Sequence, residues 1–200
     1  CVLRTRRSER GRAAPGGARA RLFLALDLPA AARAALVAWR DELVAGRSEL
    51  RAVRPEALHV TLVFLGWQRE DDADRIARLS FEAVAAQAAP RLTATGVRPL
   101  PPRRPRLFAL DLADEDRRAA AVQAALSDAL EAARLFRPER RPFWPHLTLA
   151  RVKRDAVAAP LPELPPPSRP FDASELTLYR STLLPQGARY DALARTRLGA

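Results

Sequence analysis

The chain contains two histidines, and both stand in the same four-residue pattern, His-x-Thr-Leu. The two copies are His59-Val-Thr61-Leu and His146-Leu-Thr148-Leu. Because side chains alternate along a β-strand, each histidine shares a face with the threonine two positions later, and the apolar residues between and after them enter the core. Two such strands that face each other would enclose a cleft with two imidazoles and two hydroxyls.

Two imidazoles in one cleft are suited to a pair of proton transfers. Because the pKa of an imidazole lies near neutrality, one histidine can act as general base while the other acts as general acid. These roles fit a displacement at phosphorus, in which the attacking oxygen loses a proton and the leaving oxygen gains one. The threonine hydroxyls can donate hydrogen bonds to non-bridging phosphate oxygens without adding charge.

Other kinds of site fit the two motifs less well. A single histidine on a strand is more often structural than catalytic, but two in matched contexts favour catalysis. Two histidines are too few for a metal site, and no Asp, Glu or Cys shares the face of either motif, so we expect neither a metal nor a cofactor. Nucleophilic catalysis by cysteine or serine lacks support, because Cys1 is the only cysteine and no nucleophile-elbow motif is present.

Apolar patterns predict the elements that position these motifs. Strands are predicted at 21–27, 58–65 (ended by Gly66), 91–98, 106–112, 145–151, 172–180 and 189–197. Helices are predicted between Pro29 and Gly46, around 76–83 and over 116–135, and proline-rich loops at 99–105 and 158–170.

The order of these elements repeats. A strand from Leu22, a helix and the strand of His59 are echoed by a strand from Leu107, a helix and the strand of His146. Similar order at similar spacing indicates an internal duplication. We therefore expect an α+β fold with two pseudo-symmetric lobes, each an antiparallel sheet with flanking helices, which face a central cleft.

Composition limits the class of protein. Residues 1–18 are rich in Arg, Gly and Pro and predict a disordered basic arm, which leaves 19–200 as one bilobal domain. The formal net charge of +11 suits a polyanionic partner such as RNA or a nucleotide. No apolar run is long enough to span a membrane. The single cysteine favours a reducing compartment, so we expect a cytoplasmic protein. We also expect a monomer.

Several strings of residues resemble the 2H phosphoesterase superfamily, from about Arg21 to Leu198. The strings are RLFLAL at 21–26, RPEALHVTLVFLG at 54–66, RPFWPHLTLAR at 141–151 and LYRSTLLPQG at 178–187. Within the superfamily they are similar to the RNA 2′,3′-cyclic phosphodiesterases, also called 2′-5′ RNA ligases. The resemblance implies metal-independent hydrolysis of an RNA 2′,3′-cyclic phosphate end to a 2′-phosphate, with reversible 2′-5′ ligation as a second activity.

The resemblance also implies roles for the motif residues. His59 would protonate the departing 3′ oxygen, and His146 would activate water. Thr61 and Thr148 would bind the phosphate. Arg151 is a further candidate for substrate binding, although simple alternation places it opposite His146.

One residue departs from the family pattern. Many relatives carry a basic residue where this chain has Val63, which simple alternation places beside Thr61 on the cleft face. The absence of a basic residue at position 63 predicts less positive charge in the cleft. Phe64 alternates to the inner face, while Phe143 and Trp144 are candidates for stacking on a nucleobase.

Two alternative functions stay open. The same chemistry fits another nucleotide, such as ADP-ribose 1″,2″-cyclic phosphate or a 2′-5′ oligoadenylate. A protein of a different class, an RNA-end binding module without turnover, would also place a phosphate in such a cleft.

Overall fold

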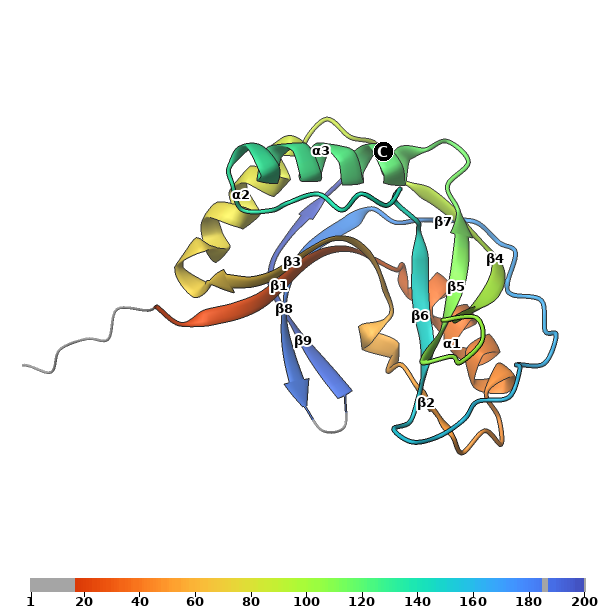
Figure 1. Cartoon of the computed structure of the whole chain (residues 1–200). Helices are drawn as coiled ribbons and strands as arrows, with labels where there is room; N and C mark the ends of the chain where they lie inside the picture. The colour runs from red at the N-terminus through yellow and green to blue at the C-terminus, as the bar shows by residue number, and fades with distance from the viewer. Residues whose placement is uncertain (1–16, 185–186, 200) are drawn as a thin grey trace, which may run out of the picture.

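The computed structural model describes residues 17–184 and 187–199 (Figure 1). Residues 1–16 of the predicted basic arm lie outside the described residues. The described part begins just before the first strand, where the Ala18 carbonyl already accepts a hydrogen bond from the Glu70 N–H at 2.8 Å. None of the helices described is long and apolar enough to cross a membrane.

Two antiparallel sheets form the frame of the protein, as the predicted α+β fold requires. The first sheet has the order β3-β1-β8-β9, with β3 His59–Arg69, β1 Arg19–Asp27, β8 Glu175–Leu184 and β9 Gly187–Arg197. The second has the order β2-β6-β5-β4-β7, with β2 Leu50–Ala52, β6 His146–Val152, β5 Leu107–Ala113, β4 Arg91–Leu100 and β7 Phe171–Asp172. The strands predicted at 91–98 and 106–112, on either side of the proline-rich loop 99–105, pair with each other as β4 and β5.

The three predicted helices are confirmed. They are α1 Ala30–Leu43, α2 Ala73–Ala83 and α3 Arg118–Ala132, and two short 3-10 turns, η1 Pro55–Ala57 and η2 Glu70–Asp72, precede β3 and α2. In α1 the residues at helical spacing, Leu36 and Leu43 among them, are buried. Helix α3 is shorter than predicted because Arg117 and Arg134 adopt positive φ angles at its two ends.

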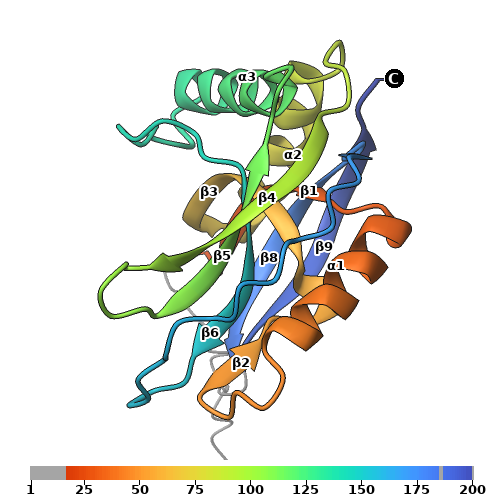
Figure 2. The same cartoon turned by 90° about the vertical axis from the view of Figure 1, so that its right-hand side faces the viewer.

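The helices of the two halves are exchanged between the sheets. Helix α3 follows β5 in the chain but contacts β3 of the first sheet, and α2 packs beside it (Figure 1). Helix α1 follows β1 but lies along the second sheet (Figure 2), where Leu36 shares a cavity with Ala94 of β4 and Phe171 of β7. One hydrophobic core therefore joins both repeats. Full burial of each large side chain in it contributes about 1.5–3 kcal/mol.

Strand boundaries differ from the prediction in two places. Gly66 does not end β3, because its φ of 69° allows a register shift against β1 and the strand continues to Arg69. The strand predicted at 172–180 is divided into β7 and β8, because Phe171 and Asp172 pair with β4 of the second sheet whereas the strand from Glu175 pairs with β1 of the first.

Candidate active site

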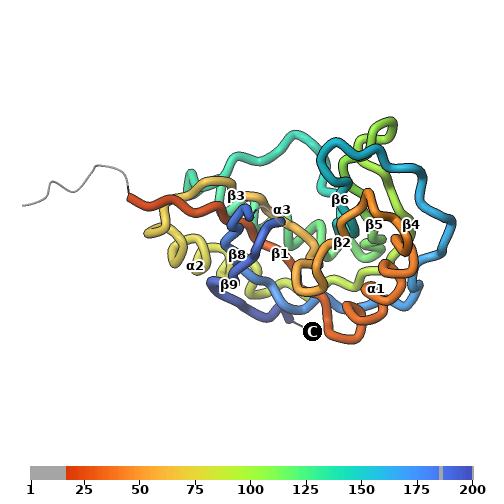
Figure 3. Tube along the Cα trace, turned by 90° about the horizontal axis from the view of Figure 1, so that it is seen from below, coloured from red at the N-terminus to blue at the C-terminus, as the bar shows by residue number. Residues whose placement is uncertain are grey.

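Each histidine is the first residue of a strand that borders the site. His59 is the first residue of β3 and His146 the first of β6, and these strands contact each other across the sheets (Figure 3). Both imidazoles line one cleft with a volume of about 490 Å³, together with Thr61, Thr148 and Arg151. All five residues predicted for the site therefore lie in one cavity.

Residues from both sheets complete the wall of the cleft. The others are Arg21, Phe23, Arg51, Val53, Ala57, Phe64, Ser181, Leu183, Leu184, Gly187, Ala188 and Tyr190. The predicted alternation within both motifs is confirmed, because Val60, Leu62, Leu147 and Leu149 are all buried in the core.

A register shift directly after the first motif changes which side chains reach the cleft. Thr61 pairs with Ala25, but Val63 pairs with the adjacent Leu24, which leaves Leu62 as an extra residue in β3. Val63 is consequently buried in the core, and Phe64 turns into the cleft, where it is 42% exposed. Both predictions from simple alternation were wrong. Val63 does not lie on the cleft face, so its lack of charge takes nothing from the cleft, and Phe64 does not lie in the core.

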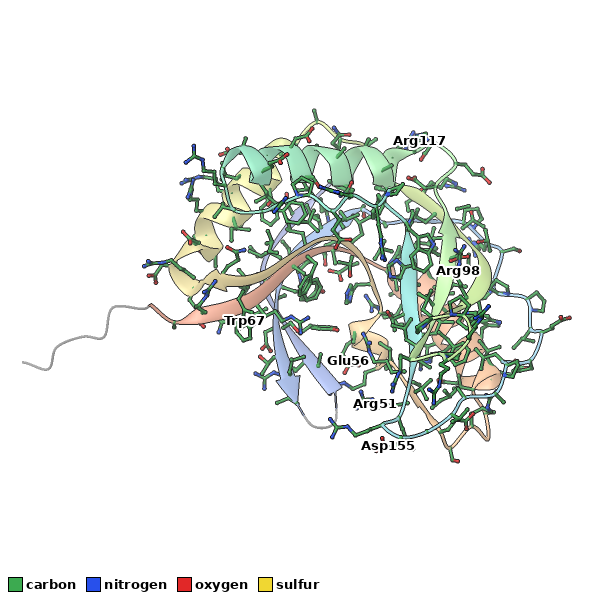
Figure 4. All side chains as sticks on the ribbon, in the orientation of Figure 1. Arg51, Glu56, Trp67, Arg98, Arg117 and Asp155 are labelled. Atoms are coloured by element: carbon green, nitrogen blue, oxygen red, sulfur yellow. The ribbon has the colours of Figure 1, made fainter. Side chains whose placement is uncertain are left out.

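The second motif has the same irregularity at the same place. Thr148 pairs with Ala109 and Ala150 pairs with Phe108, so that Leu149 is the extra residue in β6. Arg151 therefore lies on the cleft face, although simple alternation places it on the opposite face, and its side chain is exposed there. Arg51, paired with Arg151 across β2 and β6, adds a second guanidinium to the cleft (Figure 4).

His59 lies among aromatic rings. Its imidazole is 4.9 Å from the ring of Phe23 and 5.1 Å from that of Tyr190, measured between centroids. Burial lowers the pKa of His59 to about 4, against smaller raising effects of a hydrogen bond to the Ala57 carbonyl and of the Asp27 carboxylate. The neutral imidazole thus dominates at pH 7.

His146 is held by Trp144. The two rings stack with centroids 4.1 Å apart and planes 12° apart, and the Trp144 carbonyl accepts a hydrogen bond from His146 Nδ1 at 2.8 Å. Nε2 is therefore the nitrogen left for the cleft. The Arg98 guanidinium lies over the Trp144 indole at 5.1 Å. Because His146 and Arg98 both pack against the indole, Trp144 orients the histidine. These contacts leave little of the indole ring for the predicted stacking of Trp144 on a nucleobase.

Two carboxylates beside the histidines were not found from the sequence. Asp27 pairs with His59 across β1 and β3, and Asp111 pairs with His146 across β5 and β6. Asp111 accepts a hydrogen bond from the Trp144 indole N–H at 3.0 Å and forms an ion pair with Arg98 at 2.8 Å. The signal was present, since each aspartate stands in the strand of its half that precedes the motif, but only the strand register shows it.

Asp27 is part of a buried hydrogen-bond network. Its two carboxylate oxygens accept hydrogen bonds from the Thr177 hydroxyl at 2.6 Å and the Tyr179 hydroxyl at 2.7 Å. Burial, followed by the neighbouring Asp27, raises the pKa of Tyr179, so that its hydroxyl stays a donor. The network fixes a negative charge on the strand next to His59.

The remaining candidates lie elsewhere. Phe143, the other residue predicted to stack on a nucleobase, packs against the core. Arg180, within the family-like string 178–187, forms an ion pair with Glu70 at 3.5 Å. Within residues 17–184 and 187–199, no group of three or more His, Cys, Asp or Glu side chains is placed to hold a metal ion.

Comparisons with known proteins point to one family. The profile of the 2′-5′ RNA ligase superfamily matches residues 28–183. The RNA 2′,3′-cyclic phosphodiesterase of Escherichia coli is 32% identical over 89% of this chain and 96% of its own length, and that of Thermus thermophilus is 33% identical over 89% and 90%. The crystal structure of E. coli LigT complexed with 3′-AMP is similar at a TM-score of 0.72 and 29% identity, covering 90% of this chain and 99% of that one.

Proposed function

The chain belongs to the 2′-5′ RNA ligase superfamily, and we propose that it hydrolyses the 2′,3′-cyclic phosphate at the end of an RNA to a 2′-phosphate. The observation that carries the proposal is the pair of imidazoles that line a single cleft with two threonine hydroxyls. Relatives from E. coli and T. thermophilus carry the name of this activity. Location in the cytoplasm and the monomeric state stay predictions.

The proposed reaction needs one base and one acid. His146 takes a proton from water as the water oxygen bonds to phosphorus, the bond from phosphorus to O3′ breaks, and His59 gives a proton to O3′. The Thr61 and Thr148 hydroxyls donate to the non-bridging oxygens, and the Arg151 guanidinium attracts the anion. The products are a 3′-hydroxyl and a 2′-phosphate.

The acid role places a requirement on His59. Its low pKa favours the neutral imidazole in the free protein. A bound cyclic phosphate adds negative charge to the cleft, and Asp27 already supplies a negative charge from the neighbouring strand. Both favour the imidazolium, so we propose that substrate binding charges His59 for proton donation.

Joining of RNA ends uses the same groups. A ribose hydroxyl of a second RNA would replace water as the nucleophile, and a 2′-5′ linkage would form in place of the free 2′-phosphate. The same groups would also act on a smaller nucleotide such as ADP-ribose cyclic phosphate.

The test is to incubate the protein, with EDTA present, with a short RNA that ends in a 2′,3′-cyclic phosphate and to resolve the product. The expected product is the 2′-phosphate, and the variants His59→Ala and His146→Ala should each lose about 10²–10⁴-fold in rate with an unchanged circular dichroism spectrum. Hydrolysis that stops in EDTA would contradict the metal-independent mechanism. Tight binding of the RNA without turnover would favour the end-binding module instead.

A further inference from the structure

The sheet face that carries His59 continues beyond the cleft. Helices α2 and α3 cover one face of the first sheet, and among the described residues no helix covers the other (Figure 1). Trp67, near the end of β3, projects from this uncovered face (Figure 4). Its neighbour Gln68 points the opposite way, since its amide donates a hydrogen bond to the Leu135 carbonyl beyond the end of α3.

Strand register identifies the side chains that share this face. Residues directly opposite each other on antiparallel strands project to the same side. Phe64 pairs with Phe23, and Trp67 pairs with Arg21. Phe23 and Arg21 both line the cleft, so the row from His59 through Phe64 to Trp67 is one continuous surface.

The row exposes aromatic surface that folding alone would bury. Trp67 is 59% exposed and Phe64 42%, and each has a wide apolar ring face open to solvent. Since strands rise about 3.3 Å per residue, the two rings lie roughly 10 Å apart along β3. Trp67 makes no ring–ring or cation–π contact with any other described residue.

Arginines accompany the rings. The Arg21 guanidinium lies 4.7 Å over the Phe64 ring, and the Arg19 guanidinium donates a hydrogen bond to the Trp67 carbonyl at 2.8 Å. Neither guanidinium has a carboxylate partner within residues 17–184 and 187–199. The row ends where Arg69 pairs with Asp71 and the acidic turn 70–72 begins. Aromatic rings alternating with unpaired cations are the pattern of single-stranded nucleic-acid surfaces.

We propose that this row binds the nucleotide that precedes the cyclic end of the RNA, with its base stacked on Trp67 and its phosphate near Arg21 and Arg19. The proposal rests on the proposed function. Because a 2′,3′-cyclic phosphate terminates the 3′ end, the rest of the RNA leaves the cleft in the 5′ direction only. The uncovered face is continuous with the cleft and offers that strand both stacking and positive charge.

The test compares substrates of different length. Trp67→Ala should raise the KM for a tetranucleotide with a 2′,3′-cyclic end about tenfold, because base stacking is lost, and leave kcat unchanged. The KM for a 2′,3′-cyclic mononucleotide should not change, since its base does not reach Trp67. Trp67→Phe keeps a ring and should restore most of the affinity. Arg19→Gln should lower the salt dependence of tetranucleotide binding by about one phosphate contact.

Two controls separate this proposal from its premise. Val157, 83% exposed and outside the row, is the matched control, because Val157→Ala removes exposed apolar surface without a stacking partner for RNA. Binding of the tetranucleotide with a linear 3′-phosphate needs no turnover, so weaker binding by Trp67→Ala would support the row even if the hydrolysis itself were wrong. Equal KM values of wild type and Trp67→Ala for the tetranucleotide would overturn the proposal. A change in oligomeric state without a change in KM would overturn it too, in favour of self-association.

Discussion

Phe64 and Arg151 are equivalent residues in the two halves of the protein. Each is the fifth residue after its histidine, and each lines the cleft because one extra residue interrupts the strand after the Thr of its motif. The duplication therefore places a ring and a guanidinium at matching positions on opposite walls. At this pair of positions one half supplies an aromatic ring and the other a guanidinium for the phosphate.

The same register shifts bury Val63 and bring Arg151 to the cleft, so mutations of these two residues should have different effects. Val63→Lys places a charge in the core, where Val63 is 1% exposed, and should destabilise the protein by several kcal/mol in urea unfolding. Arg151→Gln changes an exposed side chain and should leave stability within about 0.5 kcal/mol of wild type while raising the KM about tenfold.

The matched control is Val63→Ile, which adds one methylene to the core and no charge. If Val63→Lys folded with normal stability and bound RNA more tightly than wild type, Val63 would lie on the cleft face after all, and the register shift would be wrong.

The sequence was sufficient for what alternation and order determine. Both motifs, the side to which His59 and Thr61 point, the helices and the two-sheet α+β fold follow from local periodicity and from the repeat. The exchange of α1 and α3 between the sheets does not, because a helix reads as amphipathic whichever sheet it covers.

What the sequence did not reveal depends on strand register. A one-residue shift reverses the later side chains, so simple alternation places Phe64 and Arg151 on the wrong faces, although Arg151 was still named as a candidate for substrate binding. Asp27 and Asp111 were not found for a related reason: each lies opposite a histidine only when its strand pairs in one particular register.

The acid and base roles can be separated by changing the leaving group. In a substrate with sulfur in place of O3′, the leaving thiolate needs no proton. The variant that lacks the acid should then recover most of its rate, while the variant that lacks the base should stay slow. We expect His59→Ala to recover and His146→Ala not to, in single-turnover assays with oxygen and sulfur substrates compared side by side. Recovery of His146→Ala alone would exchange the two roles.

Asp27 should act on the reaction through His59. Asp27→Asn removes the negative charge beside His59 and should lower the pKa of that imidazole further, so kcat should fall about tenfold while the KM changes little. Chemical shifts of the His59 ring, followed by NMR from pH 3 to 8, measure the pKa directly. Tyr179→Phe removes one hydrogen bond to Asp27 but keeps the charge, so its kcat should fall less. An unchanged His59 pKa in Asp27→Asn would leave Asp27 a purely structural role.

The low pKa of His59 also makes stability depend on pH. Folded protein holds the His59 proton only below about pH 4, whereas the unfolded chain takes it up near 6.5. Between these values the unfolded state binds more protons, so the free energy of unfolding rises with pH. The contribution of this residue is complete above pH 6.5 and is lost as the pH falls to about 4, a loss of at most about 3 kcal/mol and less to the extent that the ring stays open to the cleft.

The check is the difference between wild type and His59→Gln, which keeps a polar side chain that does not titrate. Urea unfolding from pH 4 to 8 should show wild type losing stability on acidification faster than His59→Gln, with the two curves parallel above pH 7. All other groups are the same in both proteins, so their contributions cancel in the difference. A difference that does not vary with pH would mean that burial does not depress the pKa of His59, and the requirement that substrate binding charge it would fall with it.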